Sequence, residues 1–512
     1  MNFKIKQLDI IFFYTAVILC SISLTSCAQI PVAKTKSTLT KVKKPNIIFI
    51  MLDDLGKEWI ETYGADNIQT PAINKLAKEG MQFKNSWSMP QCTPSRVTLI
   101  TGQYPWRHGW INHFDVPRWG HGAQFDPNFN PSFARVMQSA GYVTCAAGKW
   151  QINDFRLQPE VMTAHGFDEY CMWTGAEGGN EKVSQERYWD PYIHTKEGSK
   201  TYKGKFGEDV FSDFIIDFMK ENKEKPMMIY YPMCLPHGPL VATPSEPNVT
   251  AKMEKHKAMV TYTDFILNKL INALEDLKIR DNTIIVWTTD NGTGGNIVGH
   301  MNGRTIRGGK TFLTENGVNA PFIVNCPGKV PAGVVTDALV DFTDILPTFA
   351  ELGGANIPSD YIGDGNSFAS LILGKSKDSS REWTMALGSR AATLENGRVK
   401  NIHTFRDRAI RNKRFKAFVN RNQIIDEIYD LSNDVEEERN LIYNRNVEVV
   451  EALRLFNKVI KKLPKEDANP KYKKLTNSFY DVELEILQEQ HKRNVKKGNH
   501  APKATGVKTK RK

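Results

Sequence analysis

Two pairs of adjacent polar residues could hold a metal ion. Asp53 and Asp54 follow one apolar run of the chain, and Asp290 and Asn291 follow another. Two neighbouring carboxylates that leave a buried strand repel each other and lose hydration unless a cation lies between them. A ligand set made of oxygen atoms suits Ca²⁺, and Mg²⁺ less well, rather than zinc. Helix capping and turn formation are the commoner uses of either pair alone.

A cysteine is the candidate nucleophile. Cys92 lies two residues before Pro94, and the apolar residues that follow predict a helix that begins near this point. The positive end of the helix dipole, together with Arg96, favours an anion there. The residues alone therefore indicate an activated thiolate, and a small buried side chain is the alternative interpretation.

Strands and helices alternate along the chain, and we expect them to position these residues. Apolar runs predict strands at 46–52, 142–147, 227–233, 283–289 and 321–325, and periodic patterns predict helices at 70–79, 129–140, 209–221 and 259–277. This order predicts an α/β protein whose sheet is covered on both faces. Ligands of such sheets bind beyond the carboxyl ends of the strands, where Asp53, Lys149, His237 and Asp290 lie.

The pattern changes after about residue 375. Short segments at 383–387, 409–411, 415–419 and 427–430 predict antiparallel strands, and 447–463 predicts a helix. We therefore expect a main domain at 45–375 and a smaller C-terminal subdomain at 376–464.

The basic charge of the chain is concentrated at its two ends. The net charge is +11, yet residues 46–460 carry −4, and this distribution argues against a nucleic-acid partner.

Residues 1–26 resemble a bacterial signal peptide of the lipoprotein type. Cys27 would then be acylated, and residues 27–44 would form a tether. An ordinary cleaved signal is the alternative. We expect residues 465–512 to form a basic, partly disordered tail, and the protein to be exported and membrane-anchored, in the periplasm or at the cell surface.

The other cysteines leave two interpretations open. Disulfides are possible in an exported protein, and buried free thiols are at least as compatible with the strand-like neighbours of Cys145 and Cys326. The same choice holds for Cys171 and Cys234. The chain has no Cys-x-x-Cys pair that indicates a metal site.

The sequence Cys92-Thr-Pro-Ser-Arg96 resembles the Cys-x-Pro-Ser-Arg signature of the type I sulfatases, in the alkaline-phosphatase-like superfamily. Further segments resemble that family in the same order over roughly residues 45–460: 53–56, 101–109, 141–150, 236–239, 290–292, 307–321 and 427–441. The resemblance implies an α/β/α sandwich with a smaller C-terminal subdomain of antiparallel sheet and helix.

The resemblance also implies the chemistry. Cys92 would be oxidised to formylglycine by a formylglycine-generating or anaerobic maturation enzyme. One hydroxyl of its hydrate would attack sulfur, and the other would expel sulfate. One Ca²⁺ would be held by residue 92 and the two polar pairs: Asp53, Asp54, Asp290 and Asn291. Arg96 would hold the formylglycine, Lys149 and Lys310 would bind sulfate oxygens, and His237 would bind sulfate or protonate the leaving oxygen.

Two residues bear on the substrate. The family has His where this chain has Gln151, which can donate a hydrogen bond but cannot exchange a proton. His300 follows the second metal pair and is a candidate substrate contact. Aromatic residues in the ranges 106–119, 173 and 188–192 could stack on sugar rings, although core packing is the alternative for each.

The sequence therefore predicts a sulfuric ester hydrolase acting on a sulfated polysaccharide or oligosaccharide, such as ulvan, carrageenan or fucoidan. A phosphatase or phosphodiesterase of the same superfamily and a non-catalytic polyanion-binding lipoprotein are the alternatives.

Overall fold

The computed structural model describes residues 43–111, 124–155, 158–174, 187–389, 392–395 and 398–473. The predicted signal peptide, Cys27, nearly all of the tether and the tail beyond residue 473 lie outside this range. In the part of the chain that the structure describes, no helix is both long and apolar enough to cross a membrane.

A mixed ten-stranded sheet forms the centre of the protein, in the order β12-β2-β11-β8-β1-β7-β3-β4-β5-β6. Strands β8, β1, β7, β3 and β4 run parallel, whereas β11 is antiparallel to both of its neighbours. The strands are β1 Asn46–Leu52, β2 Met81–Trp87, β3 Val143–Lys149, β4 Glu169–Trp173, β5 Tyr192–Thr195, β6 Gly198–Thr201, β7 Met227–Pro232, β8 Thr283–Thr289, β11 Phe322–Asn325 and β12 Val334–Asp341. All five predicted strands are confirmed.

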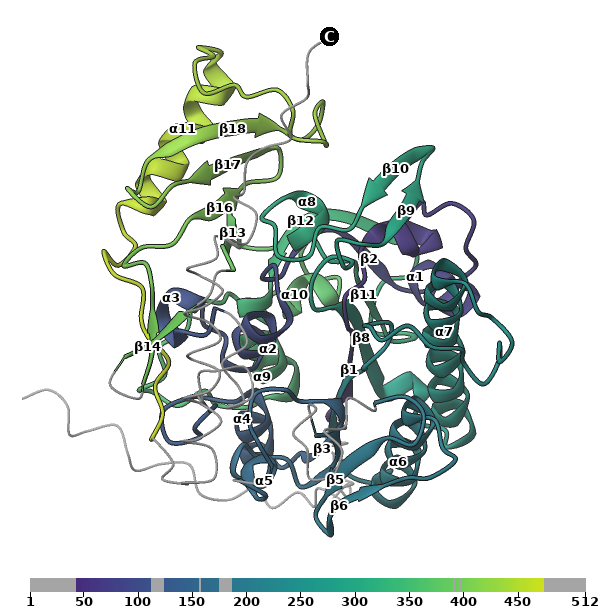
Figure 1. Ribbon diagram of the computed structural model, residues 1–512. Coiled ribbons are helices and arrows are strands. Elements are labelled where there is room, and N and C mark those ends of the chain that lie inside the picture. The colour runs from purple at the N-terminus through teal and green to yellow at the C-terminus, as the bar shows by residue number, and fades with distance from the viewer. Residues whose placement is uncertain are drawn as a thin grey trace, which may run out of the picture. The chain divides into compact units, whose positions relative to one another are not determined.

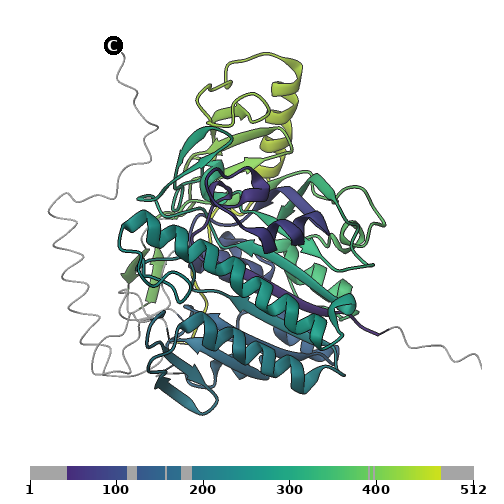
Figure 2. The same ribbon diagram turned by 90° about the vertical axis from the view of Figure 1, so that its right-hand side faces the viewer.

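Helices cover both faces of this sheet, because its central strands are apolar on both sides. Along β1, Ile47, Phe49 and Met51 belong to one core cluster, and Ile48 and Ile50 belong to the other. Figure 1 shows the two helical layers. The first consists of α2 Cys92–Thr101, α4 Phe133–Ser139 and α9 Ile345–Gly353, and the second of α1 Pro71–Lys78, α6 Gly207–Asn222 and α7 Lys252–Asp276. The long helices α6 and α7 lie side by side (Figure 2). The α/β/α sandwich is confirmed.

A second, antiparallel sheet follows in the C-terminal part of the chain. It has the order β13-β16-β17-β18, with α11 packed on β17. Its elements are β13 Thr384–Leu387, β16 Arg408–Arg411, β17 Phe415–Val419, β18 Ile425–Asp430 and α11 Val447–Ile460. Its apolar side chains share one core cluster with Trp87 and Trp106 from the first part of the chain. The smaller C-terminal sheet and helix are therefore also confirmed.

Short elements complete the fold. Two hairpins are formed by β9 Val298–Met301 with β10 Arg304–Arg307 and by β14 Ala392–Glu395 with β15 Arg398–Asn401. The remaining short α-helices are α3 Pro105–His108, α5 Val161–Ala164, α8 Glu315–Val318 and α10 Ala369–Ile372.

The first described residues of the predicted tail are packed against the fold. The Asp467 carboxylate accepts hydrogen bonds from Arg408 Nη2 at 2.8 and 2.9 Å, and Tyr472 is only 5% exposed within the first core cluster. Apolar and ion-pairing side chains therefore anchor residues 467–472, whereas a partly disordered tail over 465–512 stays a prediction.

Candidate active site

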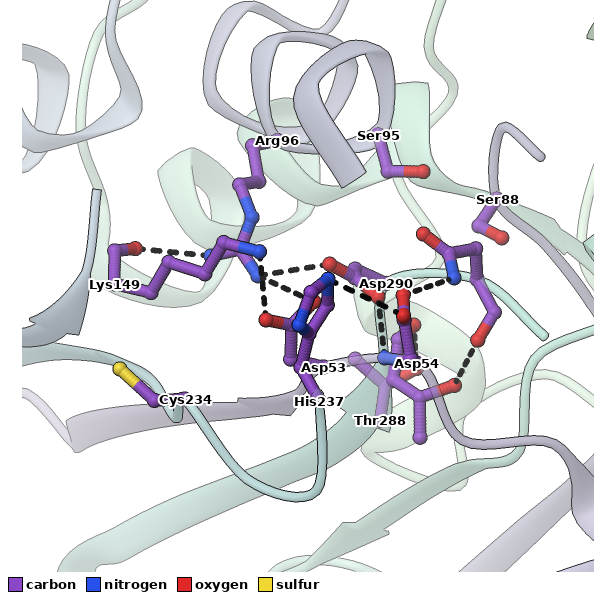
Figure 3. A network of polar contacts seen from close by, with 12 residues as sticks. Asp53, Asp54, Ser88, Ser95, Arg96, Lys149, Cys234, His237, Thr288 and Asp290 are labelled. Carbon is purple, nitrogen blue, oxygen red and sulfur yellow. Dashed lines mark hydrogen bonds and ion pairs between the residues drawn. The ribbon is translucent and has the colours of Figure 1, made fainter. Parts of the chain in front are cut away.

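The carboxyl ends of the parallel strands bring the two polar pairs together. Asp53 and Asp54 follow β1, and Asp290 and Asn291 follow β8, its neighbour in the sheet. The Asp54 amide donates to Asp290 Oδ1 at 3.1 Å, and Asn291 Nδ2 donates to Asp54 Oδ1 at 2.8 Å. All four residues are buried. Residues more than 230 positions apart in the sequence therefore form one cluster of oxygen atoms (Figure 3).

Cys92 is the first residue of α2 and is fully buried against this cluster. Its Sγ lies with one carboxylate oxygen each of Asp53 and Asp290, all three atoms being within 4.8 Å of one another. Ser95 holds the turn before the helix, since its hydroxyl donates to the Met89 carbonyl at 3.0 Å and accepts from the Met89 amide at 3.1 Å. The predicted helix start is confirmed, and it points the helix N-terminus at the carboxylates.

Arg96 lies one turn further along α2 and binds the cluster from within. Its Nη2 donates to Asp290 Oδ2 at 2.8 Å and lies 3.6 Å from Asp53 Oδ1, and its Nη1 donates to the Lys149 carbonyl at 2.9 Å. The pKa of Arg96 is raised, because the attraction of Asp290 and Asp53 outweighs the effect of burial. Arg96 is therefore a permanent cation that joins α2 to the carboxylates at the ends of β1 and β8.

Two lysines reach the cluster from other segments. Lys149, at the end of β3, donates to Asp53 Oδ2 at 2.6 Å, and Lys310, in the loop before α8, donates to Asp54 Oδ2 at 2.6 Å. Lys149 can reach Asp53 because β3 and β7 approach closely at Gly148. This glycine has a φ of 114°, and a Cβ there would lie 2.1 Å from the Pro232 carbonyl oxygen. The structure thus brings both predicted sulfate-binding lysines to the aspartates.

His237 completes this group from the loop after β7. Its Nε2 lies 3.4 Å from Asp54 Oδ2, and a quarter of its side chain is exposed. Burial lowers the pKa of His237, more than the nearby carboxylates raise it, so the imidazole is neutral at pH 7. The loop is held by the buried Glu208, which accepts from the Cys234 amide at 2.7 Å, and by the Tyr188 hydroxyl, which donates to the Cys234 carbonyl at 2.6 Å.

The residues present fit a divalent cation. Asp53 Oδ1 and Asn291 Oδ1 are buried oxygens without a hydrogen-bond partner, and oxygen ligands of this kind suit Ca²⁺ or Mg²⁺. Burial raises the pKa of Asp290, and repulsion from Asp53 raises it further. Burial would also raise the pKa of Asp53, but Lys149 and its other cationic neighbours hold it well below the usual value. Converging carboxylates with vacant oxygen lone pairs are the pattern that a bound cation relieves.

Sequence reasoning missed one cation of the site. Arg187 lies 3.2 Å from His237 Nδ1 and 3.9 Å from Asp53 Oδ2, measured from its Nη1. In the sequence, the neighbouring Tyr188 is notable only as an aromatic residue. Arg187 lies between β4 and β5 in the sequence and belongs to no motif, so its position at the site is apparent only in the folded chain.

The predicted sugar-stacking residues are mostly core residues. Trp106, Trp110, Trp173 and Tyr188 are each no more than 4% exposed, so the alternative of core packing holds for them. Residues 112–119 lie outside the described residues. Trp189 differs, because 41% of its surface is exposed. Burial of a large aromatic side chain removes much apolar surface from water, and this stabilises the fold.

Three further predictions have different outcomes. The His300 side chain, on the exposed hairpin strand β9, lies 3.3 Å from the Thr305 hydroxyl, and no described contact joins it to the aspartates. Its contact with substrate stays a prediction. Gln151 lies two residues after Lys149, is buried and has a φ of 59°. Its role in substrate binding stays a prediction. Of the two interpretations for the cysteines, disulfides or free thiols, the structure supports buried free thiols among the described residues: Cys145, Cys171, Cys234 and Cys326.

The two-layered helical covering, the sheet order and the site at the strand ends define an alkaline-phosphatase-like fold. Residues 45–355 match the family model named Sulfatase, and residues 308–465 match the model described as the C-terminal part of N-sulphoglucosamine sulphohydrolase. The chain therefore belongs to the sulfatase family.

Individual relatives are similar over most of the chain. N-acetylgalactosamine-6-sulfatase of Canis lupus familiaris is 29% identical over 355 residues, which cover 64% of this chain and 66% of the relative, just under two thirds of its length. N-acetylgalactosamine-6-O-sulfatase of Bacteroides thetaiotaomicron is 27% identical and matches 80% of this chain and 92% of its own. Ulvan-active sulfatase of Formosa agariphila is 27% identical and matches 78% of this chain and 76% of its own.

A solved structure supports the same fold. The crystal structure of Ps i-CgsB in complex with k-i-k-neocarrahexaose superposes with a TM-score of 0.69 at 25% identity. The match covers 88% of this chain and 99% of that one.

Proposed function

We propose that the protein is a sulfuric ester hydrolase that removes sulfate from a sulfated polysaccharide or oligosaccharide, using a formylglycine made from Cys92 and a bound Ca²⁺. The observation that carries the proposal is the convergence of Cys92 with Asp53 and Asp290 within 4.8 Å at the start of α2. Membership of the sulfatase family supports it, as do the relatives named for sulfated sugars.

The residues of the chain divide the work of binding a sulfate ester. Lys149 and Lys310 each use one ammonium proton on an aspartate and keep two donors for sulfate oxygens. His237 presents its imidazole on the exposed side of Asp54 and can donate to sulfate or to the leaving oxygen. Gathered cations stabilise the negative charge that develops on the sulfuryl oxygens. Arg96 keeps residue 92 at the carboxylates, because it joins α2 to Asp290 and β3.

Two groups would be added to these residues. A hydrated formylglycine at position 92 would supply two hydroxyls. One would attack sulfur while the bond from sulfur to the sugar oxygen breaks and the alcohol leaves. Loss of the proton of the other would re-form the aldehyde and release sulfate. Residue 92, Asp53, Asp54, Asp290 and Asn291 would hold a Ca²⁺ ion, which would supply positive charge and lower the pKa of a hydroxyl bound to it.

The decisive experiment expresses the full chain with a formylglycine-generating or anaerobic maturation enzyme. Mass spectrometry of the peptide that contains residue 92 should show the aldehyde. Sulfate release should follow on at least one member of a panel of ulvan, carrageenan, fucoidan and chondroitin 6-sulfate oligosaccharides. Cys92→Ala should release none, whereas Cys326→Ala, at another buried cysteine, should stay active. An unmodified Cys92 together with no sulfate release would overturn the proposal, and hydrolysis of 4-nitrophenyl phosphate instead would favour a phosphatase.

We also propose that the protein is an exported lipoprotein anchored through Cys27. The hydrophobic segment before Cys27 and the Leu-Thr-Ser-Cys sequence support this. Metabolic labelling with a fatty-acid analogue should mark the wild-type protein but not Cys27→Ser. Labelling of both would contradict the assignment.

A further inference from the structure

Arg187 is a buried cation that the reaction outlined above does not use. Its guanidinium carbon lies 4.0 Å from the centre of the Trp173 ring, and its side chain is only 8% exposed. Trp173 ends β4 and is the register partner of Lys149 at the end of β3. The stacking therefore places the guanidinium beside the lysine that is expected to bind sulfate.

The guanidinium lacks a close counter-ion. The nearest carboxylate oxygen is Asp53 Oδ2, at 3.9 Å, and Lys149 already binds this oxygen at 2.6 Å. The Arg187 Nε–H is buried without a hydrogen-bond partner. Four other buried arginines have a carboxylate oxygen at 2.5 to 2.8 Å: Arg96, Arg381, Arg408 and Arg411. The buried Arg280 donates instead to the Thr283 carbonyl and to Asn325 Oδ1.

A buried arginine with vacant donors is costly to the fold unless an anion joins it. The planar guanidinium presents parallel N–H groups that match the oxygens of sulfate and carboxylate. Stacking on Trp173 holds that plane and leaves its edge as the donor surface. The contact between Nη1 and His237 Nδ1 directs this edge toward the residues that surround Asp53 and Asp54.

We propose that Arg187 is a substrate-binding residue whose guanidinium binds an oxyanion of the sulfated sugar. The inference rests on the proposed function. The oxyanion is either the sulfate group that is cleaved or a second carboxylate or sulfate on the same sugar unit or its neighbour. In both cases Arg187 contributes to affinity, so its loss acts on KM more than on kcat.

The test uses the matured full chain and three probes. Isothermal titration calorimetry measures binding of inorganic sulfate, and kinetics are measured with 4-nitrophenyl sulfate and with a chondroitin 6-sulfate disaccharide, which carries an additional carboxylate. The variants are Arg187→Gln and Arg187→Lys. The matched control is Arg421→Gln, an exposed arginine whose nearest carboxylate is also 3.9 Å away. Melting temperatures of all variants verify folding.

Loss of a charged hydrogen bond should weaken the affected binding about 10- to 100-fold. If Arg187 binds the cleaved sulfate, Arg187→Gln weakens inorganic sulfate binding and raises KM for both substrates. If it binds the second anion, only KM for the disaccharide rises. In either case Arg187→Lys is intermediate and kcat changes less than KM.

The inference is overturned if Arg187→Gln leaves sulfate binding and both KM values unchanged, or if it lowers only kcat. The latter result would make Arg187 a positioning residue for His237. Failure of the proposed function has a different signature, because the wild-type protein would then release no sulfate from any substrate. The calorimetric arm would still report on Arg187 in that case.

Discussion

Two clusters of buried charge in this protein differ in how their carboxylates are arranged. At the strand ends, Asp53, Asp54 and Asp290 converge on one another; Arg96, Lys149 and Lys310 bind some of their oxygens, and Asp53 Oδ1 has no hydrogen-bond partner. Between α8 and the C-terminal sheet, a second cluster, called the Glu315 cluster below, alternates carboxylates with cations. Arg411 binds Glu315 at 2.7 Å.

The remaining pairs of the Glu315 cluster continue this alternation. Lys416 lies 3.3 Å from Glu315 and 2.5 Å from Glu437, and its side chain has no exposed surface. A closed alternation of this kind joins two parts of a fold and needs nothing added. Converging like charges, by contrast, indicate that something is added in the working protein. We therefore infer a ligand site where three carboxylates converge on one another, and a structural joint where one lysine lies between two carboxylates.

The largest expected effect is at the aspartate cluster. Asp290→Asn should lower the rate of sulfate release by more than the roughly 10- to 100-fold that loss of an outer partner of a metal ligand costs. Chelation of the wild-type protein should have the same effect, and added Ca²⁺ should restore only the wild type. The unfolding free energy of the metal-stripped variant should change little, because burial and repulsion from Asp53 already disfavour the Asp290 carboxylate, and the amide oxygen of asparagine can still accept from Arg96. Retention of activity by Asp290→Asn would show that the converging aspartates do not form a ligand site.

The next effect is on stability, at the Glu315 cluster. Lys416→Met leaves the buried Glu437 carboxylate without its closest cation, and should lower the unfolding free energy by about 3 kcal/mol. Lys413→Met is the matched control, since its ion pairs with Asp337 and Asp378 are exposed and should be worth at most about 1 kcal/mol. Chemical denaturation measures both variants. Equal unfolding free energies of the two variants would show that the Glu315 cluster does not hold the two parts of the fold together.

The smallest effect is the pH dependence of the same cluster. Burial would raise the pKa of Glu315, but Arg411, Lys416 and Lys57 outweigh it and lower the pKa to about 2. A carboxyl group whose pKa is lowered on folding stabilises the fold above its unfolded value of about 4.5, and this stabilisation is lost as the pH falls toward 2.

The stability difference between wild type and Glu315→Gln should therefore be on the order of 2 kcal/mol at pH 6 and shrink below pH 4.5. Urea unfolding at several pH values measures this difference. A difference that grows on acidification would contradict the assigned sign.

Most of the site could be predicted because its residues belong to contiguous motifs. Asp53 and Asp54 follow a continuous apolar strand, and Cys92 begins a helix marked by Pro94, so local pattern and chemistry agree. Arg187 could not be found in this way. Its role depends on stacking against Trp173 and on contact with His237, both distant in the sequence. The aromatic residues failed for the related reason that hydrophobicity predicts burial and sugar stacking equally well.

The amino-acid sequence by itself determined the α/β class, the strand ends that carry the polar residues and the start of the nucleophile's helix. These follow from hydrophobic periodicity and capping, which act between neighbours in the chain. The tertiary structure decided which charges are satisfied: which oxygens of Asp53 and Asn291 lack a partner, how far Arg187 lies from a carboxylate, and which charges form the Glu315 cluster. Electrostatic interactions act through space between residues hundreds of positions apart, so only the folded chain fixes their balance.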